Sequence, residues 1–136
     1  MELDTASGWA RLMADHAQAS QRHADAVRAA TQAMAHLNEI ERRRPHADAS
    51  VAVRAAYVRA RTAAEDTDLA WELDADLAYE QLMRLEQLAL SRPAKGDDAF
   101  CFKIALWERG RTDSCARSRS VFASECERFL GATDKA

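Results

Sequence analysis

Two prolines set the strongest constraint on the fold, because they divide the chain into stretches with few other breaks. Pro45 disfavours helical backbone at Arg44, and Pro93 ends the next stretch in the same way. Residues 9–44 and 51–90 are therefore predicted to form two long helices. A helix of about 36 residues is about 54 Å long, whereas a compact sphere of this chain is about 37 Å across. The long helices must therefore kink or extend beyond the rest of the chain.

The composition predicts an all-α protein. Apolar residues make up 48% of the 136 residues, but many are alanine, which favours helix while burying little surface. The predicted fold is a long antiparallel helical hairpin, about 9–44 and 51–90, followed by two short C-terminal helices, about 97–109 and 114–130. We expect a single helical domain over residues 1–136, made of the hairpin 1–90, a C-terminal helical cap 91–131 and a frayed tail 132–136.

Capping residues mark the expected helix boundaries. The candidate N-caps are Thr5, Ser7 or Asp4 for the first helix, Asp48 or Ser50 for the second, Asp97 or Asp98 for the third, and Asp113 or Ser114 for the fourth. Gly110 and Gly131 are the candidate C-caps of the two short helices. Within the second helix, Thr67 and Asp68 mark the most plausible break, because both side chains compete for backbone hydrogen bonds.

Apolar residues recur in steps of three and four along both long helices, which is typical of a coiled-coil seam. In the first helix the seam is weak and polar at its start and firmer from Val27 onward. Its expected positions are Trp9, Met13, His16, Ser20, His23, Val27, Ala30, Met34, Leu37 and Glu41. Those of the second helix are Ala64, Asp68, Trp71, Ala75, Ala78, Leu82, Leu85 and Ala89, widened by Leu69, Leu73, Leu77 and Leu88.

Bulky side chains gather after Pro93. The third helix carries Phe100, Ile104 and Trp107 on one side, with Lys103 on another. We expect these aromatic and aliphatic residues to fold back onto the leucines at the end of the second helix. Each aromatic side chain buries upwards of about 150 Å², so this corner is predicted to be the main core.

Charge is distributed unevenly within the second helix and the turn before it. Residues 42–61 hold six arginines and one acidic residue, whereas residues 65–80 hold seven acidic residues and no Lys or Arg. An antiparallel second copy of the chain would bring the basic segment against the acidic one, and it would also cover the overhanging seam. The candidate partner-binding residues are Arg42, Arg43, Arg44, Arg54, Glu65, Asp66, Asp74 and Asp76.

The two short helices offer an alternative function as a DNA-binding pair. A helix-turn-helix needs two short helices joined by a tight turn that often contains glycine, and the order of these segments fits that outline. The candidate nucleic-acid-binding residues are Arg109, Arg111, Arg117 and Arg119. The formal net charge of the chain is −3, which is unfavourable for binding to a phosphate backbone.

A metal-dependent helical-bundle enzyme is the third and weakest alternative. His16 and His23 lie two turns apart, about 10 Å, which is too far for them to share one ion without further ligands. No Glu-x-x-His motif occurs, and no His occurs in the C-terminal half to activate a Ser or Cys nucleophile. We therefore assign no catalytic, cofactor-binding or metal-binding residue.

The cysteines and the N-terminus indicate a cytoplasmic protein. Cys101, Cys115 and Cys126 are odd in number and widely spaced, which favours reduced thiols. The acidic start of the chain lacks a secretory signal, and no apolar stretch is long enough to span a membrane.

Three segments carry a resemblance to known proteins: Asp74–Glu80, Leu88–Lys95 and Asp98–Ile104. Together they resemble a segment of small uncharacterised helical proteins of alphaproteobacteria, which share a helix, a Pro-Ala turn and an Asp-started helix containing a Lys. The resemblance covers about a third of the chain. It implies a bacterial, cytoplasmic protein associated with phage or mobile elements, and it brings no catalytic residues.

These observations favour a non-enzymatic helical interaction, adaptor or regulatory protein that binds another protein and also self-associates. They predict no cofactor and no membrane partner. Nucleic acid is the less favoured partner.

Overall fold

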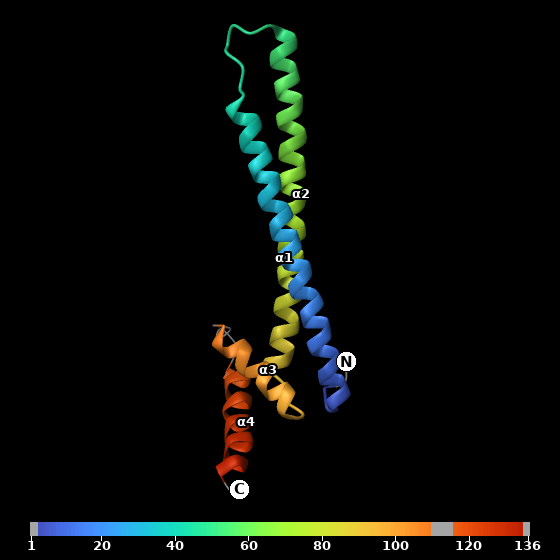
Figure 1. Ribbon diagram of the computed structural model, residues 1–136, viewed down its shortest axis with the longest axis vertical. Helices are drawn as coiled ribbons and strands as arrows, with labels where there is room; N and C mark the ends of the chain where they lie inside the picture. Colours follow the sequence, from blue (N-terminus) through green and yellow to red (C-terminus); the bar gives the residue numbers. More distant parts are fainter. Residues whose placement is uncertain (1–2, 110–115, 135–136) are drawn as a thin grey trace. The chain divides into compact units, whose positions relative to one another are not determined.

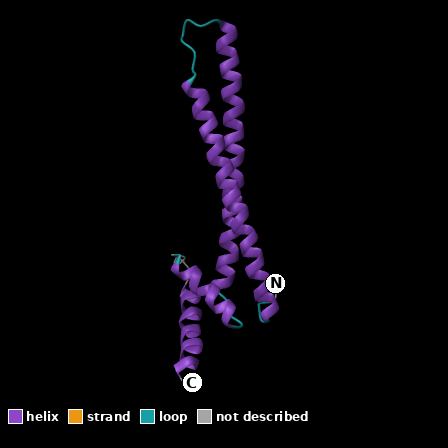
Figure 2. Cartoon of the chain, viewed as in Figure 1, coloured by secondary structure: helices purple, strands orange, loops and turns teal. Residues whose placement is uncertain are grey.

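The computed structural model describes residues 3–109 and 116–134, and within the last helix the side chains of residues 120–131. The described residues form helices joined by short turns, with no strand among them (Figure 2). The helices are α1 (Ala6–Arg42), α2 (Val51–Leu90), α3 (Asp97–Glu108) and α4 (Ala116–Asp134). The prediction of an all-α hairpin followed by two short helices is confirmed.

Local hydrogen bonds explain where the long helices begin. Thr5 Oγ1 accepts a hydrogen bond from the Gly8 amide at 3.0 Å, and Ser50 Oγ accepts one from the Val53 amide at 3.2 Å. Both are N-cap interactions, and they select Thr5 and Ser50 among the expected caps. The expected break at Thr67 is wrong: α2 is continuous, and Thr67 Oγ1 donates to the Ala63 carbonyl one turn earlier.

The ends of the short helices differ from expectation. Gly96, with φ of 93°, occupies the N-cap position of α3, and Asp97 and Asp98 lie in the first turn. A left-handed backbone is open to glycine at little cost, so Gly96 begins α3 and the carboxylates add favourable charge at its N-terminus. The expected C-cap at Gly131 is wrong, because α4 continues to Asp134. Gly110 lies outside the described residues.

The chain divides into two compact units. Unit 1 combines residues 1–20 with residues 81–136, and unit 2 is the segment 21–80. Unit 1 thus holds the start of α1, the end of α2 and both short helices (Figure 1). Unit 2 holds the rest of the two long helices and the connection between them.

Unit 1 contains the hydrophobic core. The expected corner is confirmed, since Phe100 and Leu106 of α3 are buried together with Leu90 of α2. The core also includes Trp9 and Leu12 from the start of α1, with 1% and 0% of their surface exposed. The Phe100 ring stacks on Phe129 of α4 with 4.5 Å between the ring centroids, so α4 completes the core.

Unit 2 is held by small side chains. Its buried apolar residues among those described are all alanines: Ala26, Ala64 and Ala78. In α1 the inward positions include Leu12, Ala19 and Ala26 in place of the expected Met13, Ser20 and Val27, a shift of one residue. The prediction that the seam becomes firmer from Val27 onward is therefore wrong, because Val27 and Met34 are 42% and 48% exposed.

Candidate functional site

Most of the predicted partner-binding charges in unit 2 already have partners within the chain. The ion pairs are Arg42 and Arg43 with Glu39, Arg61 with Glu41 and Glu65, and Arg22 with Asp74. The Arg44 guanidinium lies 5.9 Å from the centroid of the Tyr57 ring. All of these groups are at least partly exposed, and such pairs contribute about 0–1 kcal/mol each. They orient charges more than they stabilise the fold.

Three of the predicted residues remain available for an external partner. Arg54, Asp66 and Asp76 are exposed, and none forms an ion pair within the described part of the chain. Arg54 lies in the basic half of α2, and the two carboxylates lie in its acidic half. The structure therefore leaves charge of both signs exposed along one helix.

A row of large apolar side chains is exposed on α2. Leu69, Leu73 and Leu77 are spaced one turn apart and are 55%, 55% and 61% exposed. Val51 and Val58 are also exposed and lie on the same side of the helix. We call these five residues the outer face of α2, because helical geometry places them away from the buried Ala64 and Ala78. The expectation that these leucines widen the buried stripe is wrong.

A groove lies between α1 and α2 within unit 2. It has a volume of about 340 Å³ and is lined by Val27, Ala30, Thr31 and Met34 of α1 and by Glu72, Ala75 and Asp76 of α2. The groove exists because alanines at the inward positions leave Val27 and Met34 on its wall. It combines an apolar floor with carboxylates from α2.

The candidate DNA-binding arginines are only partly within the described residues. Arg109 is exposed at the end of α3. Arg111 and the side chains of Arg117 and Arg119 lie outside the described part of the chain, as does Cys115. DNA binding through these residues stays a prediction.

The two candidate histidines lie in different units and in different surroundings. His16 is buried in unit 1, where its Nε2 is 3.1 Å from Glu86 Oε1 and its ring meets the edge of Phe102. His23 lies in unit 2 against the Tyr79 ring, with 5.6 Å between the centroids. Neither belongs to a cluster of three or more His, Cys, Asp or Glu side chains in the described residues.

A buried ion pair that the sequence did not indicate lies in unit 1. Lys103 of α3 is fully buried, and its Nζ donates to Glu125 Oε1 of α4 at 2.7 Å and to the Arg92 carbonyl at 2.6 Å. The Ala94 amide donates to the same Glu125 oxygen at 2.6 Å. The pair therefore joins α3, α4 and the turn before α3. Lys103, expected on another side of the helix from Phe100, Ile104 and Trp107, is thus as buried as the core residues of α3.

Burial lowers the pKa of Lys103 below its usual value of 10.5, and the hydrogen bond and charge of Glu125 oppose part of that effect. Between the folded pKa and 10.5 the unfolded chain then binds more protons than the folded one, so stability rises with pH through that window. We expect the wild type to gain stability relative to a Lys103→Met/Glu125→Gln double variant as pH is raised from neutral toward 10.5. Urea denaturation across this range measures the difference. If the difference in free energy of unfolding between the wild type and the double variant stays constant or falls as pH rises, the pKa of Lys103 is not lowered in the folded protein.

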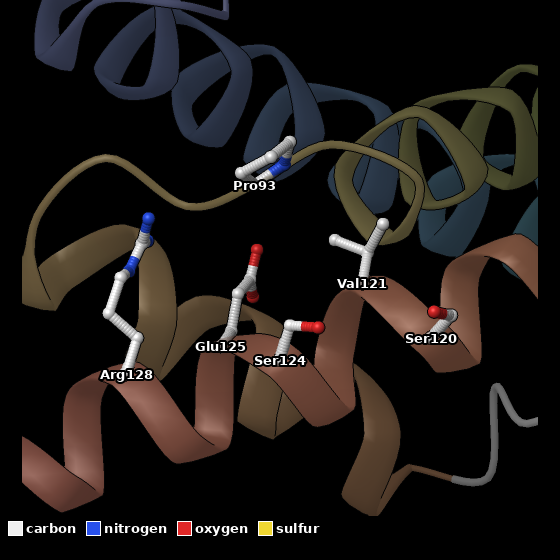
Figure 3. A pocket seen from close by; sticks show the side chains of 6 residues that line it. All are labelled: Pro93, Ser120, Val121, Ser124, Glu125 and Arg128. Atoms are coloured by element: carbon white, nitrogen blue, oxygen red, sulfur yellow. The ribbon is translucent and has the colours of Figure 1, made fainter.

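A cavity of about 310 Å³ lies beside this ion pair, between α4 and the turn before α3 (Figure 3). Its lining residues are Pro93, Ser120, Val121, Ser124, Glu125 and Arg128. Val121, Ser124, Glu125 and Arg128 are spaced three, one and three residues apart, which puts them on one side of α4. Arg128 Nη2 donates to the Ala94 carbonyl at 2.8 Å. Glu125 Oε2 has no hydrogen-bond partner among the described residues.

One sequence signal could have indicated this site. Lys103 is the only charged residue between Ala99 and Trp107, a segment otherwise made of apolar residues. A lone lysine in such a segment requires an acidic partner if the helix is buried on all sides. Nothing in the local pattern of α4 identifies Glu125 as that partner, because the pairing depends on how the helices pack.

The chain was compared with protein-family models, with curated proteins and with solved structures, and none of them matches it. Within residues 3–109 and 116–134, none of the helices combines the length and the apolar character that crossing a membrane requires.

Proposed function

We propose that this protein is a non-enzymatic helical interaction protein that self-associates through the outer face of α2 and acts as an adaptor or regulator of another protein. The observation that carries the proposal is the exposure of Leu69, Leu73 and Leu77 on one side of a continuous helix. Contiguous exposed apolar side chains of this size mark interaction surfaces in soluble proteins. The resemblance to alphaproteobacterial helical proteins supports a bacterial or phage origin and a cytoplasmic location, which we include in the proposal.

The occupant of the outer face is a second copy of α2, running antiparallel. Pairing centred on position 64 sets Val51 opposite Leu77, and it sets Val58 between Leu69 and Leu73 of the other chain. The apolar side chains of both copies then cover one another along the same stretch. The arrangement is two-fold symmetric, so each contact occurs twice and the assembly closes as a dimer.

Charge complementarity favours this antiparallel orientation. In the same register, Arg54 of one copy faces position 74 of the other and lies within a turn of Asp76 and Glu72. A parallel pairing would instead place the acidic half of one helix beside the acidic half of the other, which is repulsive. The charges select the orientation, and the leucines and valines supply most of the affinity.

Substitution of Leu73 by glutamate tests the apolar part of the interface. We expect sedimentation velocity to show a dimer for the wild type at tens of micromolar, and a dissociation constant at least about tenfold higher for Leu73→Glu. Leu130→Glu is the matched control, because Leu130 is similarly exposed but lies on α4 in unit 1. A monomeric wild type, or equal weakening by both substitutions, would contradict the proposed interface.

A charge exchange tests the orientation. Arg54→Glu and Asp76→Arg should each weaken the dimer, and the Arg54→Glu/Asp76→Arg double variant should recover much of the loss because both contacts reverse sign together. Both residues are exposed and lack ion pairs within the described chain, so folding is expected to be unchanged. Additive losses in the double variant would rule out the antiparallel pairing.

A further inference from the structure

We infer that the groove between α1 and α2 in unit 2 binds a basic amphipathic helix of another protein. The inference rests on the adaptor role proposed above, for which it names the kind of partner, and it does not depend on self-association. The groove lies within unit 2 and has a volume of about 340 Å³. Both α1 and α2 line it, and the two helices run beside each other in this part of the hairpin (Figure 1). A channel between two adjacent helices has the shape that accepts a third helix.

The floor of the groove is apolar and only partly covered. Val27 and Met34 of α1 line it and are 42% and 48% exposed, and Ala30 of α1 and Ala75 of α2 add small side chains. Val27 and Met34 are seven residues apart, which is two helical turns or about 10 Å. Apolar side chains spaced four and three residues apart on a docked helix cover the same length.

The α2 wall of the groove is acidic. Glu72 and Asp76 lie one turn apart on that wall, are exposed, and form no ion pair within the described part of the chain. The α1 wall contributes the neutral Thr31, and the neighbouring Arg28 is already paired with Asp25 at 3.2 Å. Two carboxylates one turn apart complement two basic side chains spaced four residues apart on a docked helix. The charge of the groove therefore favours lysine or arginine beside the apolar stripe of the partner.

The groove and the proposed dimer interface use different sides of α2. Leu73 belongs to the outer face, whereas the adjacent Glu72 lines the groove, and successive residues of a helix are about 100° apart around its axis. Ala75 on the groove floor lies farther still from the direction of Leu73. Asp76 is close to both surfaces, so Glu72 is the better carboxylate with which to test the groove.

A synthetic helical peptide tests the inference. The probe is an alanine-based peptide of about 18 residues, with leucines spaced four and three residues apart and lysines along one flank of that stripe. In a titration followed by the fluorescence anisotropy of the labelled peptide, we expect saturable binding with a dissociation constant below about 100 µM. A peptide with glutamate in place of each lysine, and one with the leucines dispersed around the helix, should each bind at least about tenfold more weakly. No saturable binding of the lysine peptide, or equal binding of either control peptide, would overturn the inference.

Variants of the two walls locate the binding. Met34→Lys removes an apolar contact and adds a positive charge, so it should weaken peptide binding at least about tenfold, and Glu72→Lys should weaken it at least about fivefold. The matched controls are Gln32→Lys on α1 and Asp66→Lys on α2, which make similar charge changes at exposed residues that do not line the groove. Each control should change binding by less than about twofold. All four residues are exposed, and circular dichroism checks that each variant is folded. Binding that survives both Met34→Lys and Glu72→Lys would overturn the inference.

Sedimentation velocity on the same variants separates this inference from the proposed dimer. Leu73→Glu should weaken the dimer and leave peptide binding within about twofold of the wild type, whereas Met34→Lys should weaken peptide binding and leave the dimer intact. An intact dimer that binds no peptide would overturn the groove assignment alone. If Met34→Lys dissociated the dimer instead, a second copy of the chain would be the occupant of the groove, and the inference would be overturned as well.

Discussion

Replacing Lys103 with methionine is expected to lower the free energy of unfolding by about 3–5 kcal/mol. Methionine is of similar length, but it leaves the buried Glu125 carboxylate with the Ala94 amide as its only donor among the described residues. An uncompensated buried charge is costly, and this one lies where α3, α4 and the turn before α3 meet. Urea denaturation followed by tryptophan fluorescence in a Trp71→Phe background measures the change, because the other two tryptophans are in unit 1.

The Lys103→Met/Glu125→Gln double variant separates a lost ion pair from an orphaned charge. The glutamine oxygen still accepts from the Ala94 amide, and no ion remains buried, so we expect most of the lost stability to return. Lys95→Met is the control for lysine removal, since Lys95 is exposed in the same turn and should cost less than about 0.5 kcal/mol. If Lys103→Met costs no more than Lys95→Met, the buried pair contributes nothing to folding.

The buried pair favours one arrangement of three segments. The core side chains of α3 and α4 are mostly Phe, Leu and Ile, which pack in more than one register at similar cost. Lys103 is compatible with one register only, because its Nζ donates hydrogen bonds to both the Arg92 carbonyl and Glu125. A polar contact that is satisfied in only one register specifies structure even when it adds little net stability.

The helices and their order could be predicted because local chemistry determines them. Pro45 and Pro93 end the two long stretches, and Ser50 caps α2. Each signal acts within a few residues of the boundary that it sets. The predicted span of the second helix, residues 51–90, agrees with that of α2.

Which side of each helix is buried could not be predicted as well, because alanine is compatible with both buried and exposed positions. An interpretation based on hydrophobicity places Val27 and Met34 inward, whereas the structure buries Ala26 and leaves both larger residues exposed. Small residues at the interface let two helices approach closely, and this can outweigh the larger burial that valine or methionine offers. The same ambiguity applies to the outer face of α2, whose leucines the sequence pattern assigns to one broad buried stripe.

The unit 1 cavity could not be predicted for a different reason. Its charged residues, Glu125 and Arg128, lie more than 20 residues from Lys103 and from Pro93 in the sequence, but the fold brings these residues together. Their neighbours are set by the packing of α4 against the turn before α3, which no local periodicity encodes. The predicted partner-binding charges lie instead in unit 2 and at its connection, where most pair along or between the long helices.

Replacing Trp9 with alanine is expected to lower the free energy of unfolding of unit 1 by about 3–5 kcal/mol. Trp9 is 1% exposed, packs in the same core as Leu12, Leu90 and Phe100, and donates its Nε1 proton to the Pro93 carbonyl at 3.2 Å. Its removal leaves a cavity and takes away the hydrogen bond to the Pro93 carbonyl. In the Trp71→Phe background, the fluorescence of Trp107 reports the transition.

Trp107→Ala is the matched comparison, and we expect it to cost less than Trp9→Ala. Trp107 is only partly buried, and its Nε1 has no hydrogen-bond partner among the described residues, although its ring packs on Phe122 at 4.9 Å. Trp9→Phe isolates the polar contact, since phenylalanine retains most of the apolar surface and loses only the bond to Pro93. A cost for Trp9→Ala well below that for Trp107→Ala would mean that the contact between α3 and α4, and not the start of α1, carries most of the core's stability. The larger cost for Trp9→Ala would instead show that the start of α1, a weak and polar stretch by its sequence, is needed to close the core around the turn at Pro93.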